Sequence, residues 1–308
     1  MAYVASLVMP IFAIIAMGRM AIWFRVLHPD GLAALNGFAY WIALPALLFG
    51  SIAAMQTSGW LEIAWIYLLA CILMYAVALL AAKLILGGPL ARTAVFALNA
   101  TYGNVIFLGT PVVSAVFGPD GVSLILAIIA FHSGILLPIA AVLIEISTHR
   151  NGGVLVVIRN TAGGLVRNPI IVSIFLGFVW RATGLSLPGP IQQLVALLGH
   201  AAAPLALFCL GASLPPLARE SPVMHEAVFA TILKLAILPV VVGTLARMAG
   251  LSGLPWTVAV VTAAMPTGAN AFLLARRASA FAEASASTVV IATVMSVLTL
   301  SGLLVWIR

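Results

Sequence analysis

Long apolar runs alternate with short polar segments along the whole chain, and this pattern predicts a bundle of membrane-spanning helices. A helix needs about 20 predominantly apolar residues to cross the hydrocarbon core of a bilayer. Turn-forming glycine, proline and aspartate residues separate the runs, as in the segments 28–31, 87–89, 118–121 and 187–190. The ten predicted spans are 3–23, 32–55, 61–86, 91–117, 120–146, 168–184, 188–214, 224–248, 254–277 and 284–307.

The composition agrees with a lipid environment. Hydrophobic residues make up 64% of the 308 positions and charged residues only 7%, whereas soluble domains usually carry about 25% charged residues. Ten spans and their loops occupy nearly the whole chain, so we expect no separate soluble domain. The net charge of +7 comes from scattered basic residues, which argues against nucleic-acid binding. The first run lacks the charge and cleavage patterns of a signal peptide, so we expect it to be the first span.

Lysine and arginine residues are concentrated in the loops on one side of the predicted bundle. Cytoplasmic loops of membrane proteins carry an excess of these residues. Arg181, Arg247 and Arg308 lie on the opposite side, so we expect both termini to lie outside the cytoplasm. The residues expected on the cytoplasmic side are Arg19, Arg25, Lys83, Arg92, Arg150, Arg159, Arg167, Arg219, Arg276 and Arg277.

An internal repeat divides the chain into two halves. Four residues recur 159 positions later, in the pairs Pro10 and Pro169, Gly18 and Gly177, Pro45 and Pro204, and Phe49 and Phe208. Another pair, Pro111 and Pro266, is offset by 155 positions. Because five spans per half is an odd number, the second half enters the membrane from the opposite side, as in many secondary transporters. We predict a first repeat over 1–148, a short cytoplasmic linker over 149–167 and an inverted second repeat over 168–308. An inert duplicated bundle is the alternative.

Spans 4 and 9 differ from the others because proline, glycine and asparagine interrupt them near mid-depth. Backbone groups freed by such residues are tolerated in a membrane where they line a cavity or meet a ligand. Corresponding interrupted spans in two halves therefore indicate a transport site, with simple proline kinks as the alternative. Helix N-termini and neutral side-chain amides suit a carboxylate. The predicted substrate-binding residues here are Asn104, Gly109, Thr110, Pro111, Pro266, Thr267, Gly268 and Asn270.

Two further polar residues lie inside predicted spans. His132 in span 5 is a predicted substrate-binding residue that binds an anion or carries a proton, and the alternative is a neutral histidine bonded to a backbone carbonyl. Lys234 in span 8 is interpreted as a snorkelling residue or a structural partner, with a counter-charge as the alternative. Cys71 and Cys209 lie in apolar spans and are expected to be core residues.

Motifs for catalysis or nucleotide binding do not occur in the sequence. We therefore predict that the protein is not an enzyme and has neither a cofactor nor a metal site. Only seven residues are acidic, and none lies clearly at mid-membrane. A carboxylate-based proton relay or sodium site is thus poorly supported, although backbone carbonyls and asparagine could still hold sodium.

Four motifs spread along the chain are similar to the signatures of one transporter family. They are Asn104-x-x-Phe107-x-Gly109-x-Pro111 followed by Phe117-Gly118, Asn168-Pro169, Pro204-Leu-Ala-Leu-Phe208-x-x-Gly211-x-x-Leu214, and Pro266-x-Gly268-x-x-x-Phe272-x-x-Ala275. Together they resemble the auxin efflux carrier family, which includes bacterial malonate transporters. The resemblance covers essentially the whole chain.

This resemblance implies ten helices in two inverted five-helix repeats, arranged as a scaffold domain and a transport domain. Broken spans 4 and 9 are expected to cross at the site and to carry the substrate in an elevator-like movement. In the plant carriers an asparagine at the span 4 crossing touches the substrate carboxylate, and Asn104 matches it. The plant carriers also have a polar residue in span 5 near that site, and His132 is the matching position here. The long cytoplasmic loop of the plant carriers is absent, so their specificity for auxin does not carry over.

We therefore expect a secondary-active or facilitative carrier of a small organic anion, such as malonate or an auxin-like acid, in a bacterial inner membrane. A proton or sodium ion as coupling ion and a homodimer formed through the scaffold remain open. The alternatives are a sodium-coupled symporter of the bile-acid type, a channel, a membrane sensor that does not transport, and, least favoured, a membrane enzyme.

Overall fold

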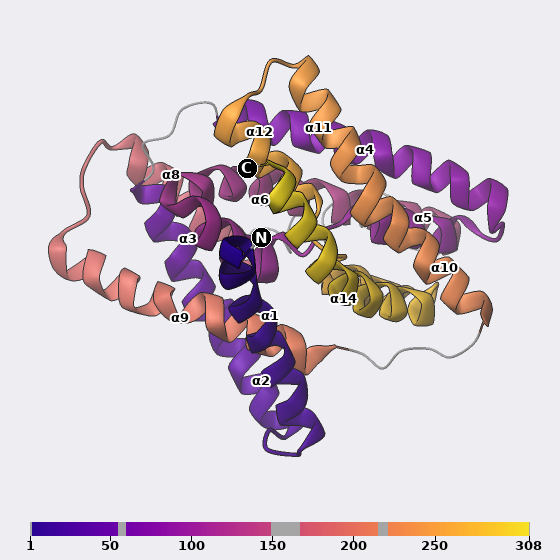
Figure 1. The fold of residues 1–308 in the computed structure, drawn as a ribbon, viewed down its shortest axis with the longest axis horizontal. Coiled ribbons are helices and arrows are strands. Elements are labelled where there is room, and N and C mark those ends of the chain that lie inside the picture. Colours follow the sequence, from indigo (N-terminus) through magenta and orange to yellow (C-terminus); the bar gives the residue numbers. More distant parts are fainter. Residues whose placement is uncertain (1, 55–59, 149–166, 215–220, 308) are drawn as a thin grey trace.

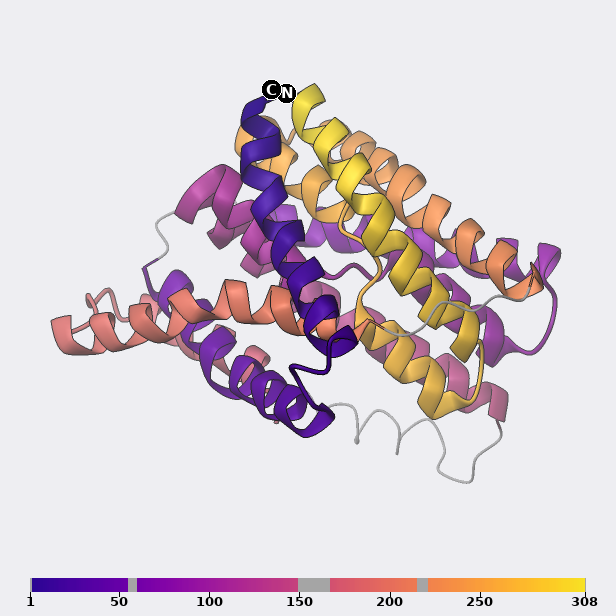
Figure 2. The same cartoon turned by 60° about the horizontal axis from the view of Figure 1, so that its bottom comes forward.

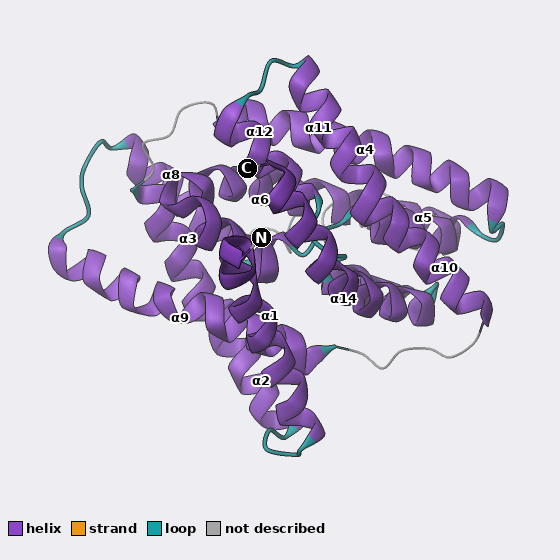
Figure 3. Ribbon diagram, viewed as in Figure 1, coloured by secondary structure: helices purple, strands orange, loops and turns teal. Residues whose placement is uncertain are grey.

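The computed structural model describes residues 2–54, 60–148, 167–214 and 221–307, and these parts are helical without any strand (Figures 1 and 3). Within them, six helical segments are long and apolar enough to cross a membrane, and shorter apolar helices cover Met9–Trp23, Pro169–Ala182 and Gly253–Ala263. The expected all-helical membrane protein is confirmed, whereas the number of ten crossings stays a prediction. Most of the predicted linker lies outside the described residues, as do Arg150, Arg159, Arg219 and Arg308.

The helices of the first half follow the predicted apolar runs closely. They are α1 (Ala2–Trp23), α2 (Pro29–Phe38), the π-helical turn η1 (Ala39–Ala43), α3 (Leu44–Ala53), α4 (Trp60–Ile85), α5 (Leu90–Thr101), the π-helical turn η2 (Val105–Gly109) and α6 (Thr110–Thr148). Helix α6 contains a non-helical residue, Gly118, with φ 64° and ψ −158°. Glycine adopts this conformation without the steric penalty of a Cβ atom, so the chain turns sharply where the sequence predicts a loop between spans 4 and 5.

The second half contains a similar succession of helices. They are α8 (Pro169–Ala182), α9 (Gly189–Ser213), α10 (Ser221–Ile232), the π-helical turn η3 (Leu233–Ile237), α11 (Leu238–Met248), α12 (Gly253–Ala263), α13 (Ala269–Ala278) and α14 (Ala282–Ile307). The side chain of Asn168 caps the start of α8 by accepting a hydrogen bond from the backbone N–H of Ile170. The short α12 and α13 replace the single ninth span of the prediction, because the helix breaks between them.

The helices form two packed groups. In the first group, α1 lies against α9, and α3 lies against both α8 and α9. In the second group, α4 packs against α5, α6 and α11, while α14 packs against α10. Figure 1 shows the first group at the lower left and the second at the upper right, and Figure 2 shows both chain termini at one end of the molecule.

Glycines allow α1 and α9 to cross at very short range. A Cβ atom added at Gly18 would lie 2.0 Å from the carbonyl oxygen of Phe208, and one added at Gly211 would lie 1.8 Å from that of Ile15. Even alanine would therefore force the two backbones apart. Small residues at helix interfaces are a common device in membranes, where apolar lipid supplies no driving force for helix association.

Candidate functional site

The breaks in the fourth and ninth predicted spans meet each other in the structure. Gly103 and Thr267 form an isolated antiparallel β-bridge. The backbone N–H of Asn104 donates to the carbonyl of Pro266 (2.7 Å), and the N–H of Gly268 donates to the carbonyl of Tyr102 (3.0 Å). We call residues 102–104 and 266–268 the crossing. Each break thus satisfies backbone groups of the other, which a membrane interior requires.

Close packing explains the glycine at position 268. A Cβ atom there would lie 2.8 Å from the ring of Tyr102 and 3.1 Å from the carbonyl oxygen of Gly103. The backbone at Gly268 has φ −76°, which any residue can adopt. Glycine is therefore required because there is no room for a Cβ atom, and not because of the backbone conformation. A larger residue would push the two broken segments apart and disturb their hydrogen bonds.

Asn104 combines a satisfied acceptor with a donor that has no protein partner. Its Oδ1 accepts a hydrogen bond from the backbone N–H of Phe107 (3.3 Å) and so caps η2. Its Nδ2 makes no hydrogen bond among the described residues, although the side chain is only 5% exposed. Buried polar groups normally find a partner, so this amide is a candidate donor to a ligand.

Other polar residues fasten the crossing to the neighbouring helices. The hydroxyl of Thr267 donates to the backbone carbonyl of Asn99 (2.9 Å), and the hydroxyl of Ser285 on α14 donates to the side-chain oxygen of Asn99 (2.9 Å). All three residues are fully buried. The crossing is therefore hydrogen-bonded to α5 and, through Asn99, connected to α14.

The two prolines of the second predicted pair occupy different places. Pro266 lies in the break, and its carbonyl takes part in the crossing. Pro111 is the second residue of α6, which continues directly from η2, where the N–H of Thr110 still donates to the carbonyl of Val105. Because proline has no backbone N–H, Pro111 interrupts this succession of hydrogen bonds at the junction of the two helices. Its neighbours Gly109 and Thr110 pack inside the same helical segment, and the hydroxyl of Thr110 donates to the carbonyl of Val105 (3.2 Å).

A cavity of about 710 Å³ opens beside the crossing. Tyr102 and Asn270 contribute to its wall from the crossing region, and Ser133 contributes from α6. The hydroxyls of Tyr102 and Ser133 share a hydrogen bond (3.1 Å), and the Nδ2 of Asn270 donates to the Tyr102 hydroxyl (3.3 Å). Asn36, Tyr40 and Asn168 complete the polar part of the wall from the other helix group, and none of the described lining residues is charged. We call this the crossing cavity.

Of the predicted site residues, only Asn270 belongs to the described wall of this cavity. His132 lies behind Tyr102, with the two rings stacked at 4.7 Å and 20°. It is fully buried, and the carbonyl of Thr101 lies near its ring without completing a hydrogen bond to either nitrogen. Tyr102 and Ser133, which the sequence reasoning missed, face the cavity instead. Tyr102 directly precedes Gly103 in the interrupted span 4, and Ser133 directly follows His132. This adjacency to residues already singled out could have identified both.

Lys234 is not a snorkelling residue, so that part of the prediction is wrong. It is fully buried, and its Nζ donates to the carbonyl of Ala263 (2.5 Å), the last residue of α12. A Cβ atom added at Gly103 would lie 3.4 Å from this Nζ. Lys234 therefore acts as a structural partner of both broken segments. A lysine side chain near the C-terminal end of a helix commonly donates a hydrogen bond to one of the last carbonyls.

The described residues contain no group of three or more histidine, cysteine, aspartate or glutamate side chains that could hold a metal ion. Cys71 and Cys209 are buried and unpaired. Among the described residues, the chemistry available at the crossing is thus hydrogen bonding by neutral amides, hydroxyls and backbone groups, with the buried amino group of Lys234 behind them.

Comparison with known proteins identifies the family. The model of the family described as "Membrane transport protein" matches residues 3–304. A "Putative malonate transporter" from Rhizobium meliloti (strain 1021) is 26% identical, with 100% of this chain and 97% of the relative aligned. "Uncharacterized transporter MJ1031" from Methanocaldococcus jannaschii is 24% identical, with 96% of each chain aligned. The chain therefore belongs to the membrane transport protein family, that of the auxin efflux carriers, and is an integral membrane transporter.

Proposed function

We propose that this transporter carries a small organic anion, with malonate and related carboxylates as the first candidates. The observation that carries the proposal is the crossing of two broken helices beside a cavity whose described wall contains no charged residue. Amide and hydroxyl donors can bind a carboxylate without the cost of burying a fixed charge. The printed name of the Rhizobium relative adds malonate as the first substrate to test.

The proposed architecture is a pair of inverted five-helix repeats, and helix contacts support it. Gly18 on α1 abuts the carbonyl of Phe208 on α9. Residues 159 positions away repeat this contact with the halves exchanged: a Cβ atom at Gly177 on α8 would lie 3.3 Å from the carbonyl oxygen of Phe49 on α3. A two-fold pseudo-axis relating the halves accounts for both contacts, because it exchanges the first helix of each repeat.

The crossing brings the interrupted spans of the two halves together. Its central bridge pairs Gly103 with Thr267. The two hydrogen bonds beside this pair, from Asn104 to Pro266 and from Gly268 to Tyr102, are those that any antiparallel bridge makes. The proposed two-fold relation between the halves therefore rests on the helix contacts and on the recurring residues of the sequence.

In the proposed mechanism, the group formed by α1, α2, α3, α8 and α9 is a scaffold, and the group that contains the crossing is a transport domain. The transport domain slides along the scaffold and carries the bound anion with it. The crossing cavity includes Asn168 and Ile170 at the start of α8, next to the predicted cytoplasmic linker. With the orientation predicted from lysine and arginine, this cavity faces the cytoplasm, and both termini lie outside.

Uptake into proteoliposomes tests this function. Purified protein would be assayed with radiolabelled malonate and a panel of other carboxylates, with and without imposed sodium and proton gradients. We expect saturable flux of at least one carboxylate, and the gradient dependence then identifies the coupling ion or a uniporter. Asn104→Ala should abolish most of this flux in a folded protein when the substrate concentration is well below the wild-type KM. Saturable binding without flux would instead indicate a sensor, and currents too large for a carrier would indicate a channel.

A further inference from the structure

A groove of about 430 Å³ lies between α11, α12 and α14, on the surface of the second helix group. The buried Gly243 and Val260 line its inner part, and the exposed Val240, Met248 and Trp306 line it toward the surface. We call it the α11 groove. Its described lining includes no residue of the crossing or of the crossing cavity, so it is a separate feature of the molecule.

The α11 groove extends inward from one end of the helices. Arg247 is the next-to-last residue of α11, and Trp306 is the next-to-last residue of α14. Both chain termini lie at this end of the molecule (Figure 2). Val240 precedes Arg247 by seven positions, which is roughly 10 Å along the helix at 1.5 Å per residue. Tryptophan and long basic side chains are typical of the membrane interface, so we place Arg247 at headgroup depth and Val240 deeper in the hydrocarbon.

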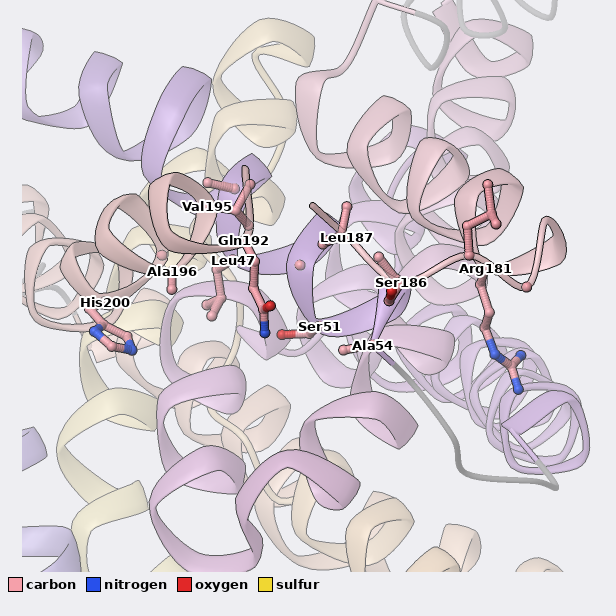
Figure 4. A pocket seen from close by; sticks show the side chains of 16 residues that line it. Leu47, Ser51, Ala54, Arg181, Ser186, Leu187, Gln192, Val195, Ala196 and His200 are labelled. Carbon is pink, nitrogen blue, oxygen red and sulfur yellow. The ribbon is translucent and has the colours of Figure 1, made fainter. Parts of the chain in front are cut away.

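Polar side chains occur only toward one end of this groove. Arg247 and Thr244, one helical turn apart, provide them, and the rest of the described lining is apolar except for the indole N–H of Trp256. A cavity of about 600 Å³ between α3, α8 and α9 is different, because Gln192 and Ser51 point toward its middle (Figure 4). The α11 groove therefore suits a molecule with one polar end and an apolar chain.

Arg247 is held in place but keeps its hydrogen-bond donors. Its guanidinium carbon lies 4.3 Å from the ring centroid of Trp256, and the indole N–H of Trp256 donates to the carbonyl of Gly243 (2.9 Å). Stacking uses the face of the guanidinium group and leaves its N–H edges available. No ion pair or hydrogen bond joins these edges to another described residue. A planar guanidinium with available edges is well suited to a phosphate.

We propose that the α11 groove binds one anionic phospholipid, with its phosphate on Arg247 and an acyl chain along Val240 and Val260. Val240 is 65% exposed and Trp306 is 71% exposed, so in an integral membrane protein the mouth of the groove faces lipid. Arg247 lies on the side of the bundle where lysine and arginine are few, so a single phosphate is its fitting partner. A zwitterionic headgroup fits less well, because its own ammonium competes for the phosphate. This site does not depend on which substrate is transported.

Native mass spectrometry of the detergent-purified protein tests the binding. The protein is titrated with phosphatidylglycerol and, separately, with phosphatidylethanolamine that has the same acyl chains. We expect one phosphatidylglycerol to bind more tightly than any phosphatidylethanolamine. Arg247→Gln should weaken the binding of phosphatidylglycerol about fivefold, equivalent to about 1 kcal/mol, and remove most of the preference between the lipids. Val240→Trp should weaken the binding of both lipids, because the larger side chain fills the groove.

Two matched controls make the same changes outside the groove. Arg181→Gln removes a basic side chain on the same predicted side of the bundle, and Val77→Trp enlarges a residue of α4 that is 59% exposed. Neither residue lines the groove, so both variants should bind phosphatidylglycerol like the wild type. Equal binding of both lipids by the wild type, or equal loss in Arg247→Gln and Arg181→Gln, would overturn the inference. A dimer that binds no lipid would overturn it as well, because a second copy would then cover the groove.

A labelling experiment in liposomes needs no variant and so does not depend on how well the variants fold. Wild-type protein is reconstituted with phosphatidylglycerol that carries a photoreactive diazirine on an acyl chain, irradiated, and analysed by peptide mass spectrometry. We expect the label to be concentrated in Leu238–Met248 and Gly253–Ala263, and excess unlabelled phosphatidylglycerol should remove it more effectively than phosphatidylethanolamine. Label spread equally over the exposed residues of α4 would refute the proposal, since the groove would then be ordinary lipid-facing surface.

Discussion

Replacing Asn104 with serine and, separately, with alanine separates the two roles of this side chain. Its Oδ1 caps η2 through the Phe107 N–H, and its Nδ2 has no described partner. Serine is about as good a cap as asparagine, whereas alanine costs about 0.5–2 kcal/mol at such a position. Both substitutions remove the side-chain amide donor; the serine hydroxyl can also donate, but its oxygen is bonded directly to Cβ and lies one bond short of the position of Nδ2. If that donor binds the substrate carboxylate, the two variants should share one defect in transport and differ in stability.

The size of the transport defect follows from the hydrogen bond that is lost. A hydrogen bond to a charged group contributes about 1.5–3 kcal/mol. Since about 1.4 kcal/mol corresponds to a tenfold change in affinity, we expect the apparent KM for the carboxylate to rise roughly 10- to 150-fold in both variants. The long 3.3 Å cap places the stability loss of Asn104→Ala near the lower end of its range.

Proteoliposome uptake and thermal unfolding in detergent measure the two effects separately. The expected pattern is equal loss of substrate affinity, with a lowered unfolding temperature only for Asn104→Ala. Wild-type affinity in a folded Asn104→Ser protein would refute the reasoning, because the cap alone would then account for this residue. A loss restricted to Asn104→Ala would lead to the same conclusion.

Three further predictions concern packing and burial. Gly211→Ala should lower the free energy of unfolding by about 1–3 kcal/mol through overpacking against α1, whereas Gly302→Ala, with open space around its Cβ, should not destabilise the protein in the same melting assay. An amine-reactive reagent should modify exposed Lys83 but not Lys234 in the folded protein, and equal labelling by mass spectrometry would contradict the burial. Tyr102→Phe should lower the free energy of unfolding by about 1–3 kcal/mol, since two neutral hydrogen bonds are lost; an unchanged melting temperature would count against this network.

Much of the fold could be predicted from the sequence, because helix bounds, turns and breaks depend on residues within one segment. Apolar runs of membrane-spanning length produced helices with nearly the predicted bounds, since length and turn residues act within one segment. The turn at Gly118 and the breaks at 102–104 and 266–268 were likewise signalled by their own glycine, proline and asparagine residues. The family followed from motifs spread over the same segments.

The orientation of side chains could not be read in this way. A soluble helix shows its buried face by an apolar stripe, but a helix between lipid and protein is apolar on all sides. The sequence therefore did not reveal that Tyr102 and Ser133 face the cavity while His132 lies behind them. For the same reason, a buried Lys234 could not be distinguished from one that reaches the interface.

The sequence by itself determined the order of the helices and the places where two of them break. Only the tertiary structure decided which groups those breaks join. The carbonyl of Ala263 meets Lys234, and Asn104 meets Pro266, across separations of 29 and 162 positions along the chain. Such partners are chosen by the packing of whole helices, because freed backbone groups in a membrane must be satisfied by whatever the fold brings beside them.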